Sequence, residues 1–546
     1  MARENQSGKR QDKAFRARFE RKLIHLKSKR KVIIVGWDGA TWSLLDRYIA
    51  EGHMPNLKHV IEDGAKGTLM STFPTVTLAA WTSIFTGVNP GKHGMIDFRV
   101  RVNGKLELTQ SNFRKVNSLW KILSTHNLKV IVVNDPVTYP PEAVNGIMIT
   151  GMLTPHNSSN FIYPSALRKE VETVSNGYIC EPSYDLFEIA SKDKSGAYGR
   201  LEEFAKKHAQ VGLHLAENYE WDVLAVIFTS TDRLQHFYWN EQDFIKRHYI
   251  FLDTILADFL RVASENDADL IIVSDHGFGA AGKALHINTW LTNNGFQIAK
   301  KSLLRSTLSS SGLTVYSIAG IVAKLHLSNL ALKLFKSLPQ SVKQALPLES
   351  HERVQTDYDN SQAYSITYQG IYINDKLAKD QYERVRNSLI EKLYAITDDG
   401  RKIVERIYKR EEVVWGPCEI TAPDLVIQPV EGYCLSTHMN SHEIDNFTDR
   451  GTVLSGNHRP DGIFVGYGPD ITDGKQLHSI LNTWDITPTI MHILKLPIPT
   501  YMDGTVVRDI FRISSEPYMR LARSYMAEEE RIKKRVESIR GKIGKK

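Results

Sequence analysis

The sequence predicts an α/β protein built on a mostly parallel, doubly wound central sheet. Two observations support this fold class: short runs rich in β-branched residues recur along the chain, and segments with helical periodicity lie between them. The runs are continuously apolar, which is typical of strands buried on both faces. The 546-residue chain is 42% hydrophobic and 24% charged, so its composition is that of a folded globular protein.

The predicted strands extend over most of the chain. Their ranges are 32–36, 130–135, 223–230, 270–275, 371–374, 424–429 and 463–468. Helices are expected between them, for example over 119–128 and 381–396, where apolar residues follow the helical period. We therefore expect one large, elaborated domain over residues 32–515.

Basic residues are concentrated at the two ends of the chain. The formal net charge is +7; residues 1–31 hold twelve Lys/Arg against three Asp/Glu, and residues 516–546 hold ten against five. We expect a basic N-terminal arm (1–31), a charged C-terminal helix or tail (516–546) and an acidic body, which argues against specific nucleic-acid binding. Such arms are typically solvated; the alternative is adhesion to an anionic membrane surface or RNA.

One internal region also differs in charge from the body. Between His276 and Leu348 there is no Asp or Glu, whereas seven lysines and one arginine are present. We expect residues 297–350, called the cap below, to form a basic helical insertion over the mouth of the sheet. The cap is either a surface for anionic headgroups or phosphorylated substrates, or a helical subdomain with solvated lysines.

The cysteines and the hydropathy of the chain bear on its location. Three cysteines, Cys180, Cys418 and Cys434, are too few and too scattered for a disulfide framework or a metal cage. No run approaches the roughly 20 apolar residues of a membrane span, and residues 1–31 lack the apolar core of a secretory signal. We expect a cytoplasmic protein, peripheral to the membrane if the arms or the cap adhere to it.

Carboxylates and imidazoles lie at or beside the ends of several predicted strands. They are Asp38, Asp232, His236, Asp275, His276 and His458. Because ligands of open α/β sheets bind at the carboxyl ends of strands, these groups are expected to meet there, where they would suit zinc or manganese. Each pair alone has an ordinary explanation as helix caps or surface histidines, but their shared topological position favours a metal site.

A hydroxyl cluster between residues 75 and 86 offers a nucleophile. Its members are Thr75, Thr77, Thr82, Ser83 and Thr86. They lie near an expected helix N-terminus, which presents free N–H groups to a phosphate, and a metal can activate such a hydroxyl. The alternative is that the cluster only caps a helix and forms turns.

The motifs resemble those of the alkaline phosphatase superfamily, and most closely its type I phosphodiesterase/nucleotide pyrophosphatase branch. In order they are GWDG, PTVT-x3-WTSIFTG-x2-PGKHG, TDRxQH, SDHG, GNHRPDG and WDITPTIMHILKLPIP. The resemblance spans about residues 32–505. It implies an alkaline-phosphatase-like α/β/α sandwich with a mostly parallel central sheet and a helical cap insertion.

The resemblance also implies a site with two divalent metal ions. Asp38, Asp275 and His276 would hold the metal that activates the nucleophile, and a second set would hold the other metal: Asp232, His236 and His458. Thr77 matches the family's nucleophile and would contact the first metal; by the sequence alone Thr75 is the next choice. His93 in PGKHG matches a residue expected to be structural.

The chain departs from the nucleotide pyrophosphatases at Phe98. The family has an Asn there that donates to a phosphoryl oxygen, so we expect a replacement from Arg99, Arg101 or a lysine of the cap. The family's aromatic nucleotide pocket is not traceable, and the loop lacks a sulfatase Cys-x-Pro-x-Arg box.

These features predict a metal-dependent phosphohydrolase that cleaves phosphodiester or phosphoanhydride bonds with a Thr nucleophile at two Zn or Mn ions. The expected substrate is a phosphorylated small molecule or a lipid-linked phosphate. One alternative is phosphomutase or phosphomonoesterase chemistry on the same scaffold. Another is a membrane- or RNA-associated binding protein without turnover.

Overall fold

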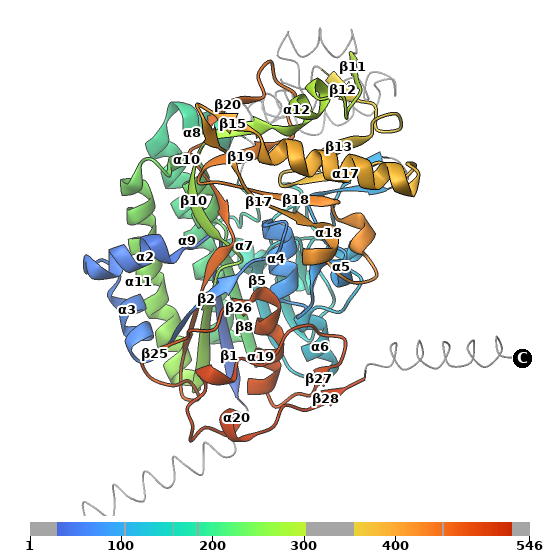
Figure 1. The fold of residues 1–546 in the computed structure, drawn as a ribbon. Helices are drawn as coiled ribbons and strands as arrows, with labels where there is room; N and C mark the ends of the chain where they lie inside the picture. Colours follow the sequence, from blue (N-terminus) through green and yellow to red (C-terminus); the bar gives the residue numbers. More distant parts are fainter. Residues whose placement is uncertain are drawn as a thin grey trace, which may run out of the picture.

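A ten-stranded, mostly parallel sheet forms the centre of the molecule (Figure 1). The computed structural model describes residues 30–102, 105–156, 158–182, 185–301, 354–449 and 452–526. The strand order is β25-β2-β24-β9-β1-β8-β5-β6-β7, with β26 also paired to β2. The bounds are β1 Lys31–Trp37, β2 Gly64–Met70, β5 Val130–Asp135, β6 Gly146–Thr150, β7 Ile162–Tyr163, β8 Val223–Phe228, β9 Ala268–Val273, β24 Asp461–Tyr467, β25 Lys475–Gln476 and β26 Leu481–Asn482.

The inner strands β9, β1, β8, β5 and β6 run parallel, which confirms the predicted sheet type. β24 and β7 are antiparallel to their neighbours, so the run over 463–468 belongs to this sheet but lies against its predominant direction. Because parallel strands end at the same edge, the loops after β1, β8 and β9 lie close together.

Helices cover both faces of the sheet, as the continuous apolar runs predict. In β1, Ile33 and Val35 belong to one buried cluster, whereas Val32 and Ile34 belong to the other. The first face carries α2 Trp42–Ala50, α3 Pro55–Glu62, α7 Arg168–Val174, α8 Leu186–Lys192, α9 Lys194–Asn218, α10 Ser230–Tyr238 and α11 Gln242–Asn266. The second carries α4 Thr77–Ile84, α6 Leu119–Thr125 and α19 Ile486–Ile493.

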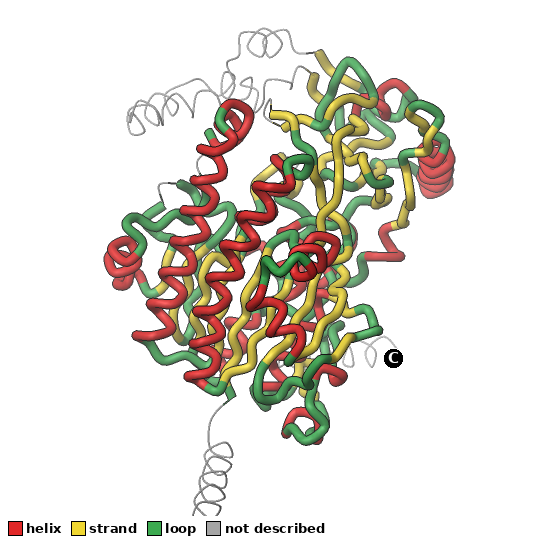
Figure 2. Tube along the Cα trace, turned by 90° about the vertical axis from the view of Figure 1, so that its left-hand side faces the viewer, coloured by secondary structure: helices red, strands yellow, loops and turns green. Residues whose placement is uncertain are grey.

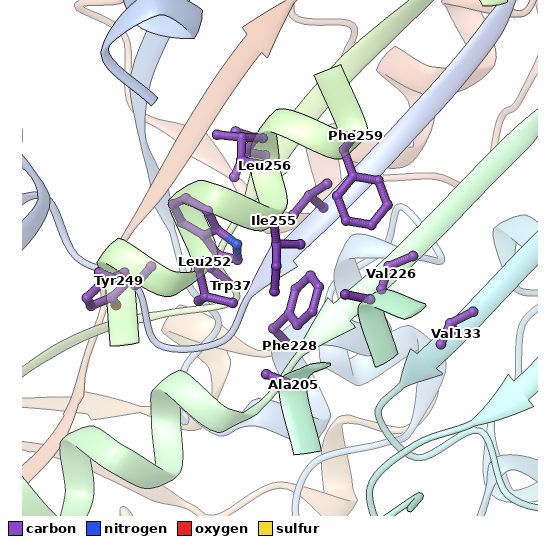
Figure 3. Packing of buried hydrophobic residues seen from close by; sticks show 14 of the residues in the cluster. Trp37, Val133, Ala205, Val226, Phe228, Tyr249, Leu252, Ile255, Leu256 and Phe259 are labelled. Atoms are coloured by element: carbon purple, nitrogen blue, oxygen red, sulfur yellow. The ribbon is translucent and has the colours of Figure 1, made fainter. Parts of the chain in front are cut away.

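The first face holds the larger aromatic core. The long helices of this layer run along the strands in Figure 2. Figure 3 shows Leu252, Leu256 and Phe259 of α11 packed over Trp37 and Phe228, which end β1 and β8. This packing fixes the helices against the strands whose ends carry the polar groups described below.

A second, antiparallel sheet lies beyond the carboxyl edge of the first (Figure 1). Its order is β13-β14-β18-β17, with bounds Ala363–Thr367, Gly370–Ile373, Leu425–Pro429 and Val404–Lys409, and α17 Lys379–Tyr394 packs on it. The runs over 371–374 and 424–429 are therefore strands of this sheet and not of the central one. Their apolar residues pack with α17 in a separate core, a difference that strand propensity does not encode.

A third set of strands links the two sheets. β10 Gly277–His286 pairs with β19 Gly432–Ser436, β20 Ile444–Asn446 and β23 Gly456–Arg459. This set brings residues 456–459 beside the start of β10, which directly follows the end of β9.

The predicted arms and cap fall mostly outside the described residues. The cap (297–350) is described only as far as β11 Ala299–Lys301, which pairs with β12 Val354–Thr356 beyond it. The basic N-terminal arm (1–31) is described from Arg30, and the C-terminal tail (516–546) up to Met526, including α20 Glu516–Met519 and β28 Ser524–Tyr525. Among the described residues no helix is long and apolar enough to span a membrane.

Candidate metal centre

The six predicted ligand residues converge at the carboxyl edge of the central sheet. Asp38 follows β1, Asp232 and His236 lie on α10 after β8, Asp275 and His276 follow β9, and His458 lies on β23. β10 pairs with β23 so that Phe278 is opposite His458, which carries this imidazole from the distant C-terminal part of the chain to the end of β9.

The first group contains Asp38, Asp275 and His276, all fully buried. His276 Nε2 lies 3.1 Å from Asp275 Oδ2 and 3.6 Å from Asp38 Oδ1. Thr77 is the first residue of α4, and its Oγ1 lies 3.2 Å from His276 Nε2. Two carboxylates, one imidazole and one hydroxyl therefore lie close together in the interior. The ligand atoms of Asp38, Asp275 and His276 are near enough to one another to hold a cation.

The second group contains Asp232, His236 and His458. Asp232 Oδ1 lies 3.4 Å from His236 Nε2 and 3.1 Å from His458 Nε2, and the two Nε2 atoms are 3.1 Å apart. The spacing of four residues on α10 places Asp232 and His236 on one helix face.

The two groups adjoin each other. The rings of His276 and His458 are stacked with centroids 3.7 Å apart, and the ligand atoms of Asp232, His276 and His458 also lie within 4.8 Å of one another. One phosphoryl group could therefore contact both groups at once.

Three carboxylate oxygens of the site lack hydrogen-bond partners among the described residues. They are Asp38 Oδ1, Asp232 Oδ1 and Asp275 Oδ2, all buried. A buried carboxylate oxygen without a donor is costly, and carboxylates taken out of water are usually paired with a cation or bound to a metal. Together with three imidazoles this donor set fits divalent zinc or manganese.

Burial and mutual repulsion act on the carboxyl groups of the first group. Burial, followed by the neighbouring carboxylate of Asp275, raises the pKa of Asp38 well above its usual value. Burial and Asp232 likewise raise the pKa of Asp275. Burial and the neighbouring His458 lower the pKa of His276, which keeps that imidazole neutral and able to bind a metal.

The second group has the opposite balance. Although burial opposes ionisation of Asp232, His236 and His458 hold the pKa of this carboxyl well below its usual value. Burial lowers the pKa of His236, but Asp232 more than offsets this, so the net pKa shift is upward. The Asp232 carboxylate therefore lies between two imidazoles, in a position that also suits a cation.

Backbone carbonyls orient the three imidazoles. His236, His276 and His458 each direct Nδ1 to a carbonyl oxygen at 2.9, 3.0 and 3.1 Å, those of Gly456, Gly277 and Thr75 in that order. Nδ1 then carries the proton, and the lone pair of each Nε2 faces the centre, as metal ligands require.

Asp38 and Asp275 are also held in place. The Trp81 indole N–H donates to Asp38 Oδ2 at 3.1 Å, and the Gly39 N–H donates to Asp275 Oδ1 at 3.2 Å. Residue 36 must be Gly for this arrangement, because a Cβ there would lie 2.5 Å from the Trp81 ring.

Of the five hydroxyls in the cluster predicted to supply the nucleophile, Thr77 alone contacts a candidate ligand residue. Thr75 Oγ1 donates to the Thr72 carbonyl at 3.1 Å, and this hydrogen bond stabilises the loop before α4. The other three are held within the helix region: Thr82 and Thr86 donate to helix carbonyls, and Ser83 bonds His93. Burial lowers the pKa of His93 to about 3, which fits the structural part expected of it.

The replacement expected at Phe98 stays a prediction, because Arg99 is the one named candidate whose side chain the structure describes. Phe98 packs against an apolar cluster that contains Val76 and Leu78, the neighbours of Thr77. The side chains of Arg101 and of the cap lysines are not described, and Arg99 is partly buried beside Asp97.

Gln369, at the turn between β13 and β14, is a residue beside the site that no sequence motif predicted. Its Oε1 accepts a hydrogen bond of 2.6 Å from the Thr75 N–H, two residues before Thr77. The two residues are 294 positions apart, and no local pattern around residue 369 marks such a contact. A cavity of about 600 Å³, lined by α7, α9 and residues that include Pro155 and Phe161, shares no residue with the metal centre.

A family model described as type I phosphodiesterase/nucleotide pyrophosphatase matches residues 32–452. The chain belongs to this family. The resemblance predicted from the motifs is thereby confirmed, and the protein is a hydrolase of the alkaline phosphatase superfamily. No curated protein sequence matches the chain.

Solved structures of the superfamily have the same fold as this chain, although their sequence identity to it is low. Phosphonoacetate hydrolase from Sinorhizobium meliloti, in complex with phosphonoacetate, is 14% identical with a TM-score of 0.51, covering 86% of this chain and 95% of its own. A mutant of the alkaline phosphatase PafA is 14% identical with a TM-score of 0.51, covering 89% and 100%. Murine ectonucleotide pyrophosphatase/phosphodiesterase 5 with AMP is 12% identical with a TM-score of 0.49, covering 88% and 100%. The first two confirm the alkaline-phosphatase-like fold predicted from the sequence.

Proposed function

We propose that this protein hydrolyses phosphodiester or phosphoanhydride bonds, with Thr77 as nucleophile and two divalent metal ions as cofactors. The observation that carries the proposal is the convergence of Thr77 with six ligand residues, three of whose carboxylate oxygens have no donor among the described residues. Asp38, Asp275 and His276 would hold one ion beside Thr77, and the second group would hold the other ion: Asp232, His236 and His458.

The residues divide the reaction into two displacements. The ions would neutralise phosphoryl oxygens and favour the ionised form of the attacking hydroxyl. Thr77 Oγ1 forms a bond to phosphorus while the bond from phosphorus to the leaving oxygen breaks. Water then cleaves the phosphothreonine ester and restores the Thr77 hydroxyl. Thr77 begins α4, and the free N–H groups at this helix N-terminus would donate to the phosphoryl oxygens.

Hydrolysis of bis(p-nitrophenyl) phosphate and p-nitrophenyl phosphate tests the proposal. Both are assayed on chelator-treated protein and after zinc, manganese or magnesium is restored, with Thr77→Ala as the inactive control. We expect metal-dependent turnover that favours the diester. Preference for the monoester would support the phosphomonoesterase or phosphomutase alternative, and metal binding without turnover of either ester would support a binding role.

The metal, the substrate and the location are inferred from ligand chemistry and from the composition of the chain. Carboxylate and imidazole ligands suit zinc and manganese equally, and zinc is our first choice. We infer a phosphorylated small molecule or lipid-linked phosphate as substrate, in a reducing cytoplasmic setting consistent with three scattered cysteines. Contact with an anionic membrane surface would come from the basic arms or the cap, whose sequences are rich in Lys and Arg.

A further inference from the structure

The second sheet contacts the loop that leads to Thr77 at three places. The rings of Phe73 and Tyr408 lie with centroids 4.8 Å apart. The Tyr368 backbone N–H donates to the buried Asp97 carboxyl. Gln369 Oε1 accepts from the Thr75 N–H at 2.6 Å. The turn between β13 and β14 is thus placed against the nucleophile loop.

The turn that carries Gln369 is rigid. Ser365 Oγ donates to the carbonyls of Thr367 and Gly370, and the Ile427 N–H donates to the Gln369 carbonyl at 2.8 Å. Gly370 packs so closely on Pro423 that a Cβ would lie 2.4 Å from that ring. The backbone of Gln369 is therefore fixed relative to the second sheet.

The hydrogen bond to Thr75 decides how the Gln369 carboxamide is oriented. An oxygen must accept from the Thr75 N–H, so the Nε2 group is the free end of the amide. No hydrogen-bond partner of Nε2 lies among the residues that the structure describes. The backbone carbonyl of the same Thr75 accepts from Nδ1 of His458, a proposed metal ligand. Thr75 is therefore hydrogen-bonded both to the Gln369 amide and to a residue of the metal centre.

Cations beside the ligand residues point elsewhere. Arg233 follows Asp232 in the sequence but pairs with Glu181. Arg459 follows His458 but donates to the carbonyls of Pro429 and Val430. Among the side chains that the structure describes on the side of the nucleophile loop, the Gln369 amide is a neutral donor with unused capacity.

We propose that Gln369 Nε2 donates to a non-bridging phosphoryl oxygen of the bound substrate and selects singly charged phosphodiesters over doubly charged monoesters. This inference rests on the proposed phosphoester hydrolysis and adds a substrate-binding residue to it. A neutral donor stabilises one delocalised negative charge, whereas a second charge on the phosphoryl group would favour Lys or Arg. Selectivity between the two esters is the difference in the affinity of the enzyme for their transition states, so a donor that suits the diester alone raises it.

Three substitutions separate donation from positioning. Gln369→Glu keeps an acceptor for the Thr75 N–H but removes the donor, Gln369→Ala removes both, and Gln369→Lys replaces the neutral donor with a cation. Gln428→Lys is the matched control, because Gln428 lies on β18 of the same sheet and its amide donates to Glu405.

The experiment measures kcat/KM for bis(p-nitrophenyl) phosphate and p-nitrophenyl phosphate with each metal-loaded variant. Loss of one such donor typically costs about 100-fold, so we expect a diester loss of that order for Gln369→Ala and Gln369→Glu. In Gln369→Lys the ratio of diester to monoester kcat/KM should fall at least ~10-fold, with no change in Gln428→Lys. Calorimetry should show tighter binding of inorganic phosphate by Gln369→Lys and weaker binding by Gln369→Glu.

The outcomes separate this proposal from the one on which it rests. Equal losses for both esters, with an unchanged ratio and unchanged phosphate affinity, would overturn substrate donation by Gln369 and leave phosphoester hydrolysis standing. Absence of turnover of either ester by the wild-type protein would overturn both.

Discussion

The indole of Trp81 determines which oxygen of Asp38 is free for a cation. Its N–H donates to Oδ2, so Oδ1 is directed to the side of His276. Since partners of this kind orient metal ligands, Trp81→Phe should weaken metal binding about 10- to 100-fold without removing a ligand. Titration of the chelated protein with zinc measures this change.

Trp120→Phe is the matched control for that substitution. Trp120 also lies in the core of the second face and donates to a buried carboxylate, Asp135 at 2.9 Å, away from the metal centre. We expect similar loss of stability in both variants but reduced metal affinity in Trp81→Phe alone. Equal affinities would show that Trp81 does not orient Asp38.

Thr77 and Thr75 differ in what their hydroxyls contact. Thr77→Ala should lower turnover by at least ~1000-fold because the covalent path is lost. Its metal content should remain that of the wild type, since Asp38, Asp275 and His276 are unchanged. Thr77→Ser should retain part of the activity. Elemental analysis and ester hydrolysis measure both quantities, and a comparable loss in Thr75→Ala with activity kept in Thr77→Ala would reassign the nucleophile.

At the scale of the element, β5 ends on the buried carboxyl group of Asp135. Burial raises the pKa of Asp135 to about 7, although Trp120 donates to it. Between pH 3.8 and 7 the unfolded chain loses this proton and the folded chain keeps it, so the free energy of unfolding falls as pH rises. Above about pH 7 both states are ionised at this residue, and the free energy of unfolding falls no further on its account.

Asp135→Asn should remove this pH-dependent loss, because an amide oxygen can still accept from Trp120. The variant should gain about 2–4 kcal/mol over the wild type at pH 8 and far less at pH 4.5. Urea unfolding at the two pH values measures the gain. A gain that does not vary with pH would mean that Asp135 is ionised in the folded protein throughout.

At the scale of the whole molecule, the metal centre joins segments from distant parts of the chain. Its residues come from the ends of β1 and β9, from α4 and α10, and from β23. A bound ion should therefore stabilise the entire domain. Zinc or manganese at 100 times its Kd should add about 2.7 kcal/mol per site and raise Tm in a concentration-dependent manner. Scanning calorimetry with and without chelator measures the shift.

Asp275→Asn tests whether that shift comes from the metal centre. The substitution removes a ligand, so the response of Tm to metal should be lost or strongly reduced. It also removes the repulsion that raises the pKa of Asp38, so the chelated variant should be at least as stable as the chelated wild type. A full metal response in this variant would place the stabilising ion elsewhere.

The sequence by itself predicted most inner strands of the central sheet and the six candidate ligand residues that the structure brings together; that these residues bind metal stays a prediction. The strands are buried on both faces and therefore carry continuous apolar runs, and Asp38, Asp275 and His276 directly follow two of them. Parallel strands end at one edge, so local patterns were sufficient to bring these residues together. The motifs also singled out Thr77, whose role as nucleophile stays a prediction.

Only the tertiary structure decided what surrounds the nucleophile loop. The strands over 371–374 and 424–429 have the same apolar character as those of the central sheet, yet they form a separate antiparallel sheet because their neighbours are α17 and each other. Gln369 reaches Thr75 through that sheet across 294 positions. Such a contact depends on how two independently packed cores meet, and local propensity carries no information about it.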